Sequence, residues 1–248
     1  MKLIFILDPL DSIKVHKDSS FAMMREADRR GHQLFILQQG DIALKNKQII
    51  GYTRKLELTD GANSHRWYQL SNPESIPLKN FDAVLMRKDP PFNMEYVYST
   101  YLLQLAENQG AHVINSPQAL RDHNEKLAIT AFPQFKPPTI VTRRESLIRD
   151  FLSEHHDIVL KTLDGMGGAN VFRVHQADHN LGVIIETITH YGTRMIMAQR
   201  YIPDIVYGDK RILLIAGKPV PYALARIPKA GESRGNLNVG GMGVAHNH

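Results

Sequence analysis

The fold can be read outward from residues 157–174, which run Asp157-Ile-Val-Leu-Lys-Thr-Leu-Asp-Gly-Met-Gly-Gly-Ala-Asn-Val-Phe-Arg-Val174. The pattern predicts an apolar strand ending in Lys161, a glycine-rich turn and a second apolar strand. Glycines at 165, 167 and 168 let successive backbone N–H groups converge on one point, because no Cβ obstructs them. Such a nest of amides binds anions, most commonly a phosphate chain, and Lys161 adds positive charge.

Two interpretations of this turn stay open from the residues alone. The turn is either a flap over the phosphates of ATP or a glycine-rich hairpin turn with a surface lysine. It matches neither G-x-x-x-x-G-K-[ST] nor G-x-G-x-x-G followed by a helix. The usual P-loop and dinucleotide-binding interpretations therefore do not fit.

Composition indicates an ordinary globular protein. The chain has 248 residues, 43% hydrophobic and 22% charged, which suits one to three domains. It contains no cysteine, so a disulfide framework, a thiolate metal site and a catalytic cysteine are excluded, and a cytoplasmic location is expected. The apolar run at the N-terminus stops at Asp8, too short for a signal peptide, and no later run approaches the roughly 20 residues that span a bilayer.

The charge pattern argues against a nucleic-acid partner, and the lack of a bilayer-spanning run argues against a membrane partner. Net charge is +5 with a pI near 9.3, but the basic residues are dispersed, whereas a nucleic-acid binder usually shows a basic stripe. A small anionic substrate suits this excess equally well. The twelve histidines lack H-E-x-x-H spacing and no G-x-S-x-G is present, so no metal or Ser-His-Asp site is expected.

The first half of the chain alternates strands and helices, which predicts a parallel sheet with helices on its faces. Ser19 or Ser20 is expected to cap a helix that Gly31 ends. Residues 59–80 are polar and carry glycine and prolines, so an irregular surface excursion is expected there. The other expected elements are strands at 2–7, 33–37, 83–86 and 112–114, a hairpin over 41–58 and a helix over 94–109.

The second half is expected to hold a further sheet and a terminal hairpin. A glycine-rich mobile loop is expected over 227–243, with the chain stopping inside or just after it. The other expected elements are strands at 139–141 and 194–201, helices at 145–154 and 181–190, and a hairpin of 209–216 with 219–227.

The hairpin of 209–216 with 219–227 is expected to carry several charged side chains on one face. If its turn centres between Gly217 and Lys218, Asp209 faces Arg226 across the ladder, and Arg211 lies on the same face. One interpretation is an exposed ion pair worth less than about 1 kcal/mol. The other is a guanidinium pair that neutralises a phosphoryl group in transfer, positioned by the aspartate. Two arginines and one aspartate leave net positive charge, which favours the second interpretation.

Two more segments suit ligands. Gln199, Tyr201 and Ile202 end a strand and could present an apolar wall to a purine, although a plain strand end is the alternative. Arg87 follows strand 83–86, and ligands of open α/β sheets sit beyond the carboxyl ends of strands, where arginine can grip a carboxylate. The loop with Lys17, Asp18, Ser19 and Ser20 converges on the same edge, where the alternative is helix capping.

Motifs along the whole chain resemble bacterial glutathione synthetase. The matching runs are Asp18-Ser-Ser-Phe-Ala-Met23, Met86-Arg-Lys-Asp-Pro-Pro-Phe92, Asn115-Ser-Pro-Gln-Ala-Leu-Arg-Asp122, Asn124-Glu-Lys126, Leu163-Asp-Gly-Met-Gly-Gly168, Met197-Ala-Gln199, Gly208-Asp-Lys-Arg211, Ala225-Arg-Ile-Pro228 and Arg234-Gly-Asn-Leu237. The resemblance implies an α/β protein of the ATP-grasp fold, with an N-terminal parallel-sheet domain over 1–122, a small ATP-grasp subdomain over 123–202 and the start of a C-terminal subdomain, expected to be incomplete, over 203–248.

The resemblance also implies an activity. ATP phosphorylates the cysteinyl carboxylate of γ-glutamylcysteine, and glycine's amine attacks the acyl phosphate, giving glutathione, ADP and phosphate. ATP and Mg²⁺ are therefore the expected cofactors, γ-glutamylcysteine and glycine the expected substrates, and a homo-oligomer the expected assembly. Family members continue past the 227–243 lid, so the Mg²⁺ ligands are expected beyond His248, and the 248-residue chain is expected to be a fragment that is inactive or poorly stable alone.

Residue roles follow from the same resemblance. It places Lys126, Lys161, Gly165, Gly167 and Gly168 at the ATP phosphates, and Gln199, Tyr201 and Ile202 at adenine. Asp209, Arg211 and Arg226 would surround the transferred phosphoryl group. The residues expected at the substrate are Arg87, Lys17, Asp18, Ser19, Ser20, Arg234 and Asn236. The competing hypotheses are another ATP-dependent carboxylate–amine ligase and a non-catalytic nucleotide-binding or oligomerisation module.

Overall fold

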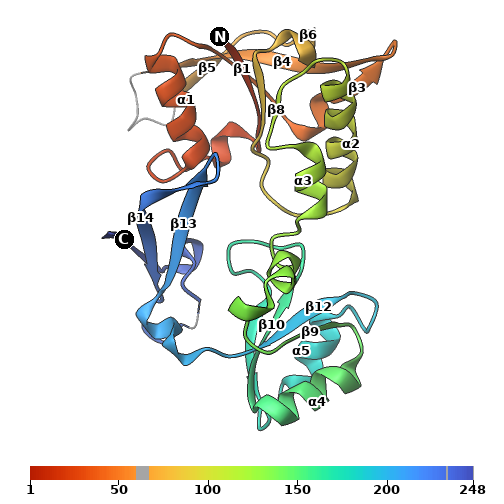
Figure 1. Cartoon of the computed structure of the whole chain (residues 1–248), viewed down its shortest axis with the longest axis vertical. Helices are drawn as coiled ribbons and strands as arrows, with labels where there is room; N and C mark the ends of the chain where they lie inside the picture. The colour runs from red at the N-terminus through yellow and green to blue at the C-terminus, as the bar shows by residue number, and fades with distance from the viewer. Residues whose placement is uncertain (60–66, 233, 248) are drawn as a thin grey trace. The chain divides into compact units, whose positions relative to one another are not determined.

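The computed structural model describes residues 1–59, 67–232 and 234–247, and the chain divides into two compact units, Met1–Asn124 and Glu125–His248 (Figure 1). The elements of the first unit are β1 Lys2–Ile6, α1 Ser19–Arg29, β2 Gln33–Leu37, β3 Ile42–Lys45, β4 Gln48–Leu58, β5 Tyr68–Leu70, β6 Glu74–Pro77, β7 Ala83–Met86, α2 Met94–Asn108, β8 Val113–Ile114 and α3 Pro117–Asp122, with short 3-10 helices at Leu10–Ser12, Gln39–Asp41 and Leu78–Asn80.

The sheet of the first unit has the order β3-β4-β2-β1-β7-β8 in the described residues, and its β2-β1-β7-β8 part is parallel. Ile4 of β1 lies beside Phe35 on one side and Val84 on the other. The predicted parallel sheet is confirmed, and β2 and β7 have the predicted bounds. The hairpin of β3 and β4 extends the sheet in the antiparallel direction.

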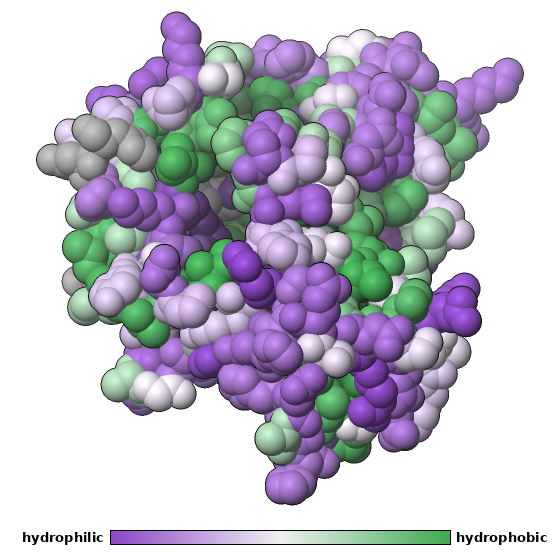
Figure 2. Space-filling view, turned by 60° about the horizontal axis from the view of Figure 1, so that its bottom comes forward, coloured by the Kyte–Doolittle hydropathy of each residue, from purple (hydrophilic) through white to green (hydrophobic). Residues whose placement is uncertain are grey.

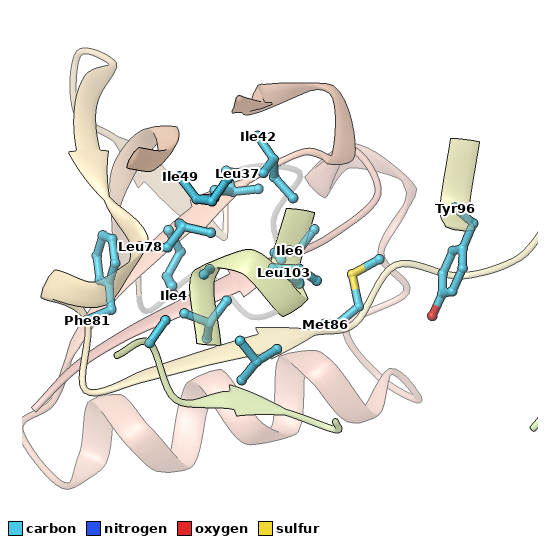
Figure 3. Close-up of a cluster of buried hydrophobic side chains, with 14 residues drawn as sticks. Ile4, Ile6, Leu37, Ile42, Ile49, Leu78, Phe81, Met86, Tyr96 and Leu103 are labelled. Carbon is cyan, nitrogen blue, oxygen red and sulfur yellow. The ribbon is translucent and has the colours of Figure 1, made fainter. Parts of the chain in front are cut away.

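Side chains along β1 point alternately to the two faces of the sheet, and both faces are buried. Ile4 and Ile6 pack in a core that includes Leu103 of α2, whereas Phe5 packs in a second core that includes Met24 of α1. Figure 3 shows the first of these cores, with Ile4, Ile6 and Leu103 converging. Because helices cover both faces, the carboxyl ends of the parallel strands are left as the edge where polar loops gather.

Two expectations for the first unit are wrong. Residues 68–70 and 74–77, predicted to be irregular, form β5 and β6 on β4, because the long β4 offers backbone groups that short strands can satisfy; residues 60–66 of that segment lie outside the described residues. The cap of α1 is Asp18 rather than a serine, since its Oδ1 accepts a hydrogen bond of 2.9 Å from the N–H of Phe21.

The second unit holds two sheets. Its elements are β9 Thr139–Thr142, α4 Glu145–His155, β10 Asp157–Thr162, β11 Val171–His175, α5 Leu181–Ile188, β12 Ile196–Arg200, β13 Asp209–Ile215, β14 Lys218–Ile227 and β15 Met242–Asn247, with short 3-10 helices at Leu127–Ala131, Pro133–Phe135, Pro203–Tyr207 and Leu237–Val239.

The first of these sheets has the antiparallel order β11-β10-β12-β9. Ile158 and Leu160 of β10 are fully buried in a core with Ile148 of α4 and Ile185 of α5. Strand side chains alternate, so the same packing turns Lys161 to the face away from these helices. The apolar pattern of β10 therefore fixes the direction of this lysine.

The other sheet has the order β13-β14-β15. The β13–β14 turn centres on Ala216 and Gly217, both with positive φ, one residue before the predicted centre. A register shift between Ile212 and Leu214 offsets this error, so Asp209 still pairs with Arg226 as predicted. Residues 242–247, the first two of which were expected in the mobile loop, form β15 on β14.

Hydrophobic side chains are not confined to the cores. Leu213 and Ile215 of β13 are 58% and 62% exposed. Hydrophobic residues also interrupt the largely hydrophilic surface on the face shown in Figure 2. No helix in the described part of the chain is both long and apolar enough to cross a membrane.

Truncating the core residue Leu103 to alanine should lower the free energy of unfolding of the first unit by about 2–5 kcal/mol, because it removes a side chain that is 0% exposed. Tyr98→Ala, on the same helix but 53% exposed, is the matched control and should change it by about 0.5 kcal/mol or less. Urea unfolding followed by the fluorescence of Trp67, the single tryptophan, measures both. Equal losses would contradict the assigned core.

Candidate active site

The glycine turn joins β10 to β11 over residues 163–170. Gly167 and Gly168 have φ of 69° and 83°, a region that other residues rarely adopt. Gly165 has no positive φ, but a Cβ there would lie 3.0 Å from Oγ1 of Thr162. Two glycines are therefore needed for backbone conformation and one for close approach.

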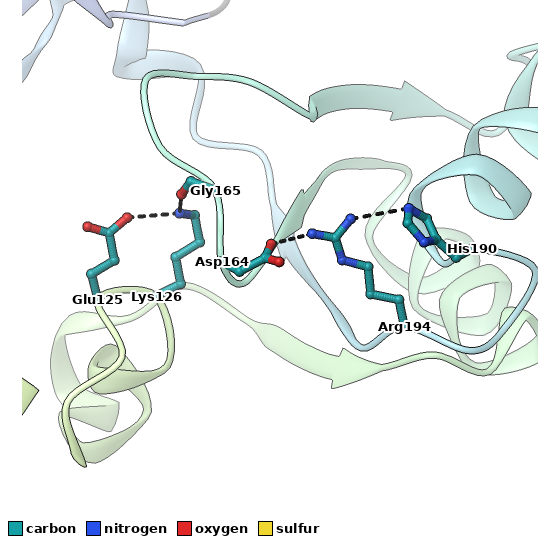
Figure 4. A network of polar contacts seen from close by, with 6 residues as sticks. All are labelled: Glu125, Lys126, Asp164, Gly165, His190 and Arg194. Carbon is teal, nitrogen blue, oxygen red and sulfur yellow. Dashed lines mark hydrogen bonds and ion pairs between the residues drawn. The ribbon is translucent and has the colours of Figure 1, made fainter. Parts of the chain in front are cut away.

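Two lysines lie beside this turn. Burial lowers the pKa of the Lys161 ammonium, and the nearby charge of Lys126 lowers it further. Lys126 donates to the carbonyl of Gly165 and pairs with Oε1 of Glu125 at 3.0 Å (Figure 4). In residues 1–59, 67–232 and 234–247, no acidic side chain forms an ion pair with Lys161. The turn and its lysines together carry an excess of positive charge that suits an anion.

The predicted charged face of the β13–β14 hairpin is present. Arg226 donates from Nε to Oδ1 of Asp209 at 3.0 Å, and a second contact joins its Nη2 to Oδ2. Arg211 lies two residues from Asp209 on the same face and makes no ion pair within the described part of the chain. The aspartate neutralises one guanidinium and leaves the other uncompensated.

The segment after β14 contacts both of these features. Arg234 donates from Nη1 to the carbonyl of Gly168 at 2.9 Å, and its Nη2 pairs with Oε2 of Glu232 at 2.6 Å. A Cβ at Gly168 would lie 2.9 Å from Oδ1 of Asn236, and one at Gly235 would lie 2.9 Å from Oδ1 of Asp209. The predicted lid therefore packs closely on the glycine turn and on the hairpin.

Two of the three residues expected at adenine contact other side chains of the protein. Gln199 is 8% exposed and donates from Nε2 to Oγ1 of Thr139 at 2.9 Å, so its amide bridges β12 and β9. The guanidinium of Arg173 lies 3.6 Å from the ring centroid of Tyr201, while Ile202 is half exposed. Sequence reasoning missed Arg173, whose place follows only from the β10–β11 register.

Arg87 and the serines of α1 come together in the first unit, as the sequence suggested. Arg87 donates from Nε to Oγ of Ser20 at 3.0 Å and from Nη2 to Oγ of Ser19 at 2.9 Å. Both hydroxyls fix the plane of the guanidinium, and Asp18 caps the helix on which they stand. Lys17 lies in the turn just before that cap.

Asp8, which sequence reasoning missed, secures the loop that carries Arg87. Its carboxylate pairs with Nζ of Lys88 at 2.7 Å and accepts from the N–H of Asp89 at 3.0 Å. Burial raises the pKa of Asp89, and the charges of Asp8 and Asp18 raise it further. The signal for Asp8 was available, because it stands two residues after the end of β1, at the carboxyl edge of the sheet.

Acidic and histidine side chains do not gather into a metal site. In the described ranges, which omit 60–66, 233 and 248, no group of three or more His, Asp or Glu side chains could hold a metal ion. The residues in these ranges therefore do not fit Mg²⁺ as a protein-ligated ion.

Two family profiles cover nearly the whole chain. The one described as "Prokaryotic glutathione synthetase, N-terminal domain" matches residues 1–121, and "Prokaryotic glutathione synthetase, ATP-grasp domain" matches residues 125–247. The chain belongs to the prokaryotic glutathione synthetase family. This confirms the resemblance that the motifs indicated and the ATP-grasp fold that it implied.

Individual relatives agree with this membership. The glutathione synthetase of Nitrosomonas europaea is 68% identical over 99% of this chain and 77% of its own length. That of Ralstonia nicotianae is 56% identical over 99% of this chain and 75% of its own length. The chain thus spans about three quarters of these relatives.

Solved structures share the fold at low sequence identity. A RimK domain ATP-grasp protein from Sphaerobacter thermophilus has a TM-score of 0.56 at 20% identity, covering 86% of this chain and 69% of its own. The D-cycloserine synthetase DcsG has a TM-score of 0.60 at 16% identity, covering 92% and 68%. At these identities the similarity concerns the fold alone.

Gly168→Ala should weaken nucleotide binding at least tenfold, because the new Cβ displaces the Asn236 side chain and strains the turn. Gly217→Ala is the matched control, since φ is +77° there but a Cβ would meet nothing within 4 Å. Calorimetry with a non-hydrolysable ATP analogue compares the two. The same affinity in both variants would show that close packing at Gly168 is unimportant.

Proposed function

We propose that the second unit holds ATP through the glycine turn and its two lysines, and that the Arg87 site of the first unit takes the acid substrate. The reaction of the family is the ATP-dependent ligation of γ-glutamylcysteine and glycine to glutathione. The observation that carries the proposal is the partly buried charge of Lys161, which lies beside Lys126 and has no acidic partner among the described residues. A protein interior disfavours such a charge unless an anion binds there.

The phosphate chain supplies the missing negative charge. Lys161 and Lys126 would pair with phosphate oxygens, and the amides of Gly167 and Gly168 would donate to them from the turn. Arg234 already donates to the carbonyl of Gly168, so the lid would close over the same phosphates. The apolar end of β12, with Gln199, Tyr201 and Ile202, would lie at adenine.

Arg211, Arg226 and Asp209 would act at the reacting phosphate. A carboxylate oxygen of γ-glutamylcysteine attacks the γ-phosphorus, and the bond to the ADP oxygen breaks. The amine of glycine then attacks the acyl carbon, loses a proton and expels phosphate. Negative charge spreads over the phosphoryl oxygens and then the tetrahedral oxygen, so fixed guanidinium groups stabilise both steps. Asp209 would keep Arg226 in place, which leaves Arg211 to contact the moving charge.

The acid substrate would meet Arg87. Ser19 and Ser20 hold its guanidinium by two hydrogen bonds, so a carboxylate of γ-glutamylcysteine could be bound by two of the three remaining N–H donors. Lys17 and Asp18 would complete this site, and Arg234 with Asn236 would contact substrate from the lid. Mg²⁺, typical of the family, would enter with the phosphates, and we propose a cytoplasmic homo-oligomer with no nucleic-acid or membrane partner.

Lys161→Met should separate binding from stability. The variant should raise Kd of an ATP analogue roughly 10- to 100-fold, because a charge-assisted contact to phosphate is lost. Its thermal midpoint without nucleotide should stay equal or rise, since folding no longer buries an unpaired charge whose pKa is lowered. Calorimetry and thermal unfolding measure the two effects.

Lys79→Met, an exposed lysine of the first unit, should change neither quantity. A Lys161→Met protein that binds the analogue like wild type would refute the phosphate site.

Arg87→Ala should raise Kd of γ-glutamylcysteine roughly 10- to 100-fold and leave Kd of a non-hydrolysable ATP analogue within about twofold, because only the carboxylate contact is removed. Arg54→Ala, at an exposed arginine of β4, serves as the control. Calorimetry gives both constants. A selective rise in Kd of the ATP analogue instead would place Arg87 at the nucleotide.

A further inference from the structure

We propose that Arg194 is the positioning residue of the glycine turn, holding it ready for phosphates without touching them. This inference rests on the proposed ATP site. Nη2 of Arg194 pairs with Oδ1 of Asp164, the second residue of the turn, and Nη1 lies 3.3 Å from Nε2 of His190 (Figure 4). The paired side chains are 28% and 32% exposed, so solvent screens the pair only in part.

The strand register explains why these two residues meet. Thr162, near the end of β10, pairs with Ile196 at the start of β12. Continuing that antiparallel register by two residues brings Asp164 opposite Arg194, just past the last ladder pair. Both then lie on the face of Thr162 and Ile196, whereas Lys161 lies on the opposite face. Arg194 therefore holds the turn from the side that faces away from the proposed phosphates.

Arg194 stands on a rigid support. The N–H of Arg194 donates to the carbonyl of Thr189 at 2.7 Å, at the end of α5. Thr189 is 2% exposed, and its hydroxyl donates to the carbonyl of Ile185 at 2.6 Å and accepts from the N–H of Gly192 at 3.1 Å. The guanidinium of Arg194 therefore ties the glycine turn to the end of α5.

The turn has a second anchor of a different kind. Lys126 donates to the carbonyl of Gly165, the residue next to Asp164. Lys126 is proposed to bind phosphate, so its hold on the turn is shared with the nucleotide. The Asp164–Arg194 pair needs no nucleotide and keeps the amides of the turn in place before ATP arrives, which lowers the cost of ordering on binding.

The alternative is a surface ion pair worth about 0–1 kcal/mol with no effect on ATP. Arg194→Ala, Asp164→Asn and the double variant distinguish the two. Each single change should raise Kd of a non-hydrolysable ATP analogue about 10- to 100-fold and leave Kd of γ-glutamylcysteine within about twofold. The double variant should be no worse than the singles, because both remove one interaction. Arg194→Lys should recover most of the affinity.

Hydrogen exchange gives a readout without nucleotide. Amides of residues 163–170 should exchange faster in Arg194→Ala, while those of α4 and β12 keep wild-type rates. The control is Arg149→Ala on α4. It breaks the 2.7 Å ion pair with Glu145, in which each side chain is 48% exposed. That control should leave exchange in the turn and Kd unchanged.

Two failures can be told apart. Suppose that Lys161→Met lowers the affinity for the ATP analogue, whereas Arg194→Ala binds it like wild type and residues 163–170 keep wild-type hydrogen exchange. In that case this inference alone is wrong. If wild type and Lys161→Met bind the analogue equally, or neither binds it, the proposed ATP site is wrong. Losses that multiply in the double variant would also overturn the positioning role, because they would mean that Arg194 and Asp164 act separately.

Discussion

The site depends on one electrostatic constraint, the partial burial of the Lys161 charge, which no acidic side chain in residues 1–59, 67–232 and 234–247 compensates. Ile158 and Leu160 must face the core of α4 and α5, so alternation along β10 directs Lys161 to the other face. There Lys126 adds a second positive charge, and both burial and this charge disfavour protonated Lys161. A fold that keeps this arrangement leaves a position whose free energy falls when an anion arrives.

The remaining contacts bring distant segments of the second unit to that position. The lid reaches the glycine turn through Arg234 and the charged hairpin through Gly235. Glycines stand where a Cβ would separate these segments, at 168 and 235. Close backbone approach and excess positive charge are the two properties that a phosphoryl-transfer site needs, and here the same short segments supply both.

Local pattern predicted much of this fold. The bounds of β2 and β7 were correct because apolar runs with polar flanks define buried strands. The pairing of Asp209 with Arg226 was also correct, although the turn lies one residue earlier, because the register shift inside the hairpin restores it. The family and its activity came from motifs spread along the chain, which no single motif would have established.

What sequence could not give depends on tertiary contacts. Residues 59–80 look irregular alone, yet part of them pairs with β4. Asp8, Arg173 and Arg194 each act through a partner that only strand register or sheet order brings near. The adenine contact of Gln199 stays a prediction, and its amide also bridges two strands, which the sequence of β12 alone does not reveal.

A crystal structure with a non-hydrolysable ATP analogue tests the central claim most directly. The account predicts phosphate oxygens within about 3 Å of Nζ of both Lys126 and Lys161, beneath the amides of Gly167 and Gly168. An analogue bound elsewhere, with Lys161 still lacking an anionic partner, would contradict it.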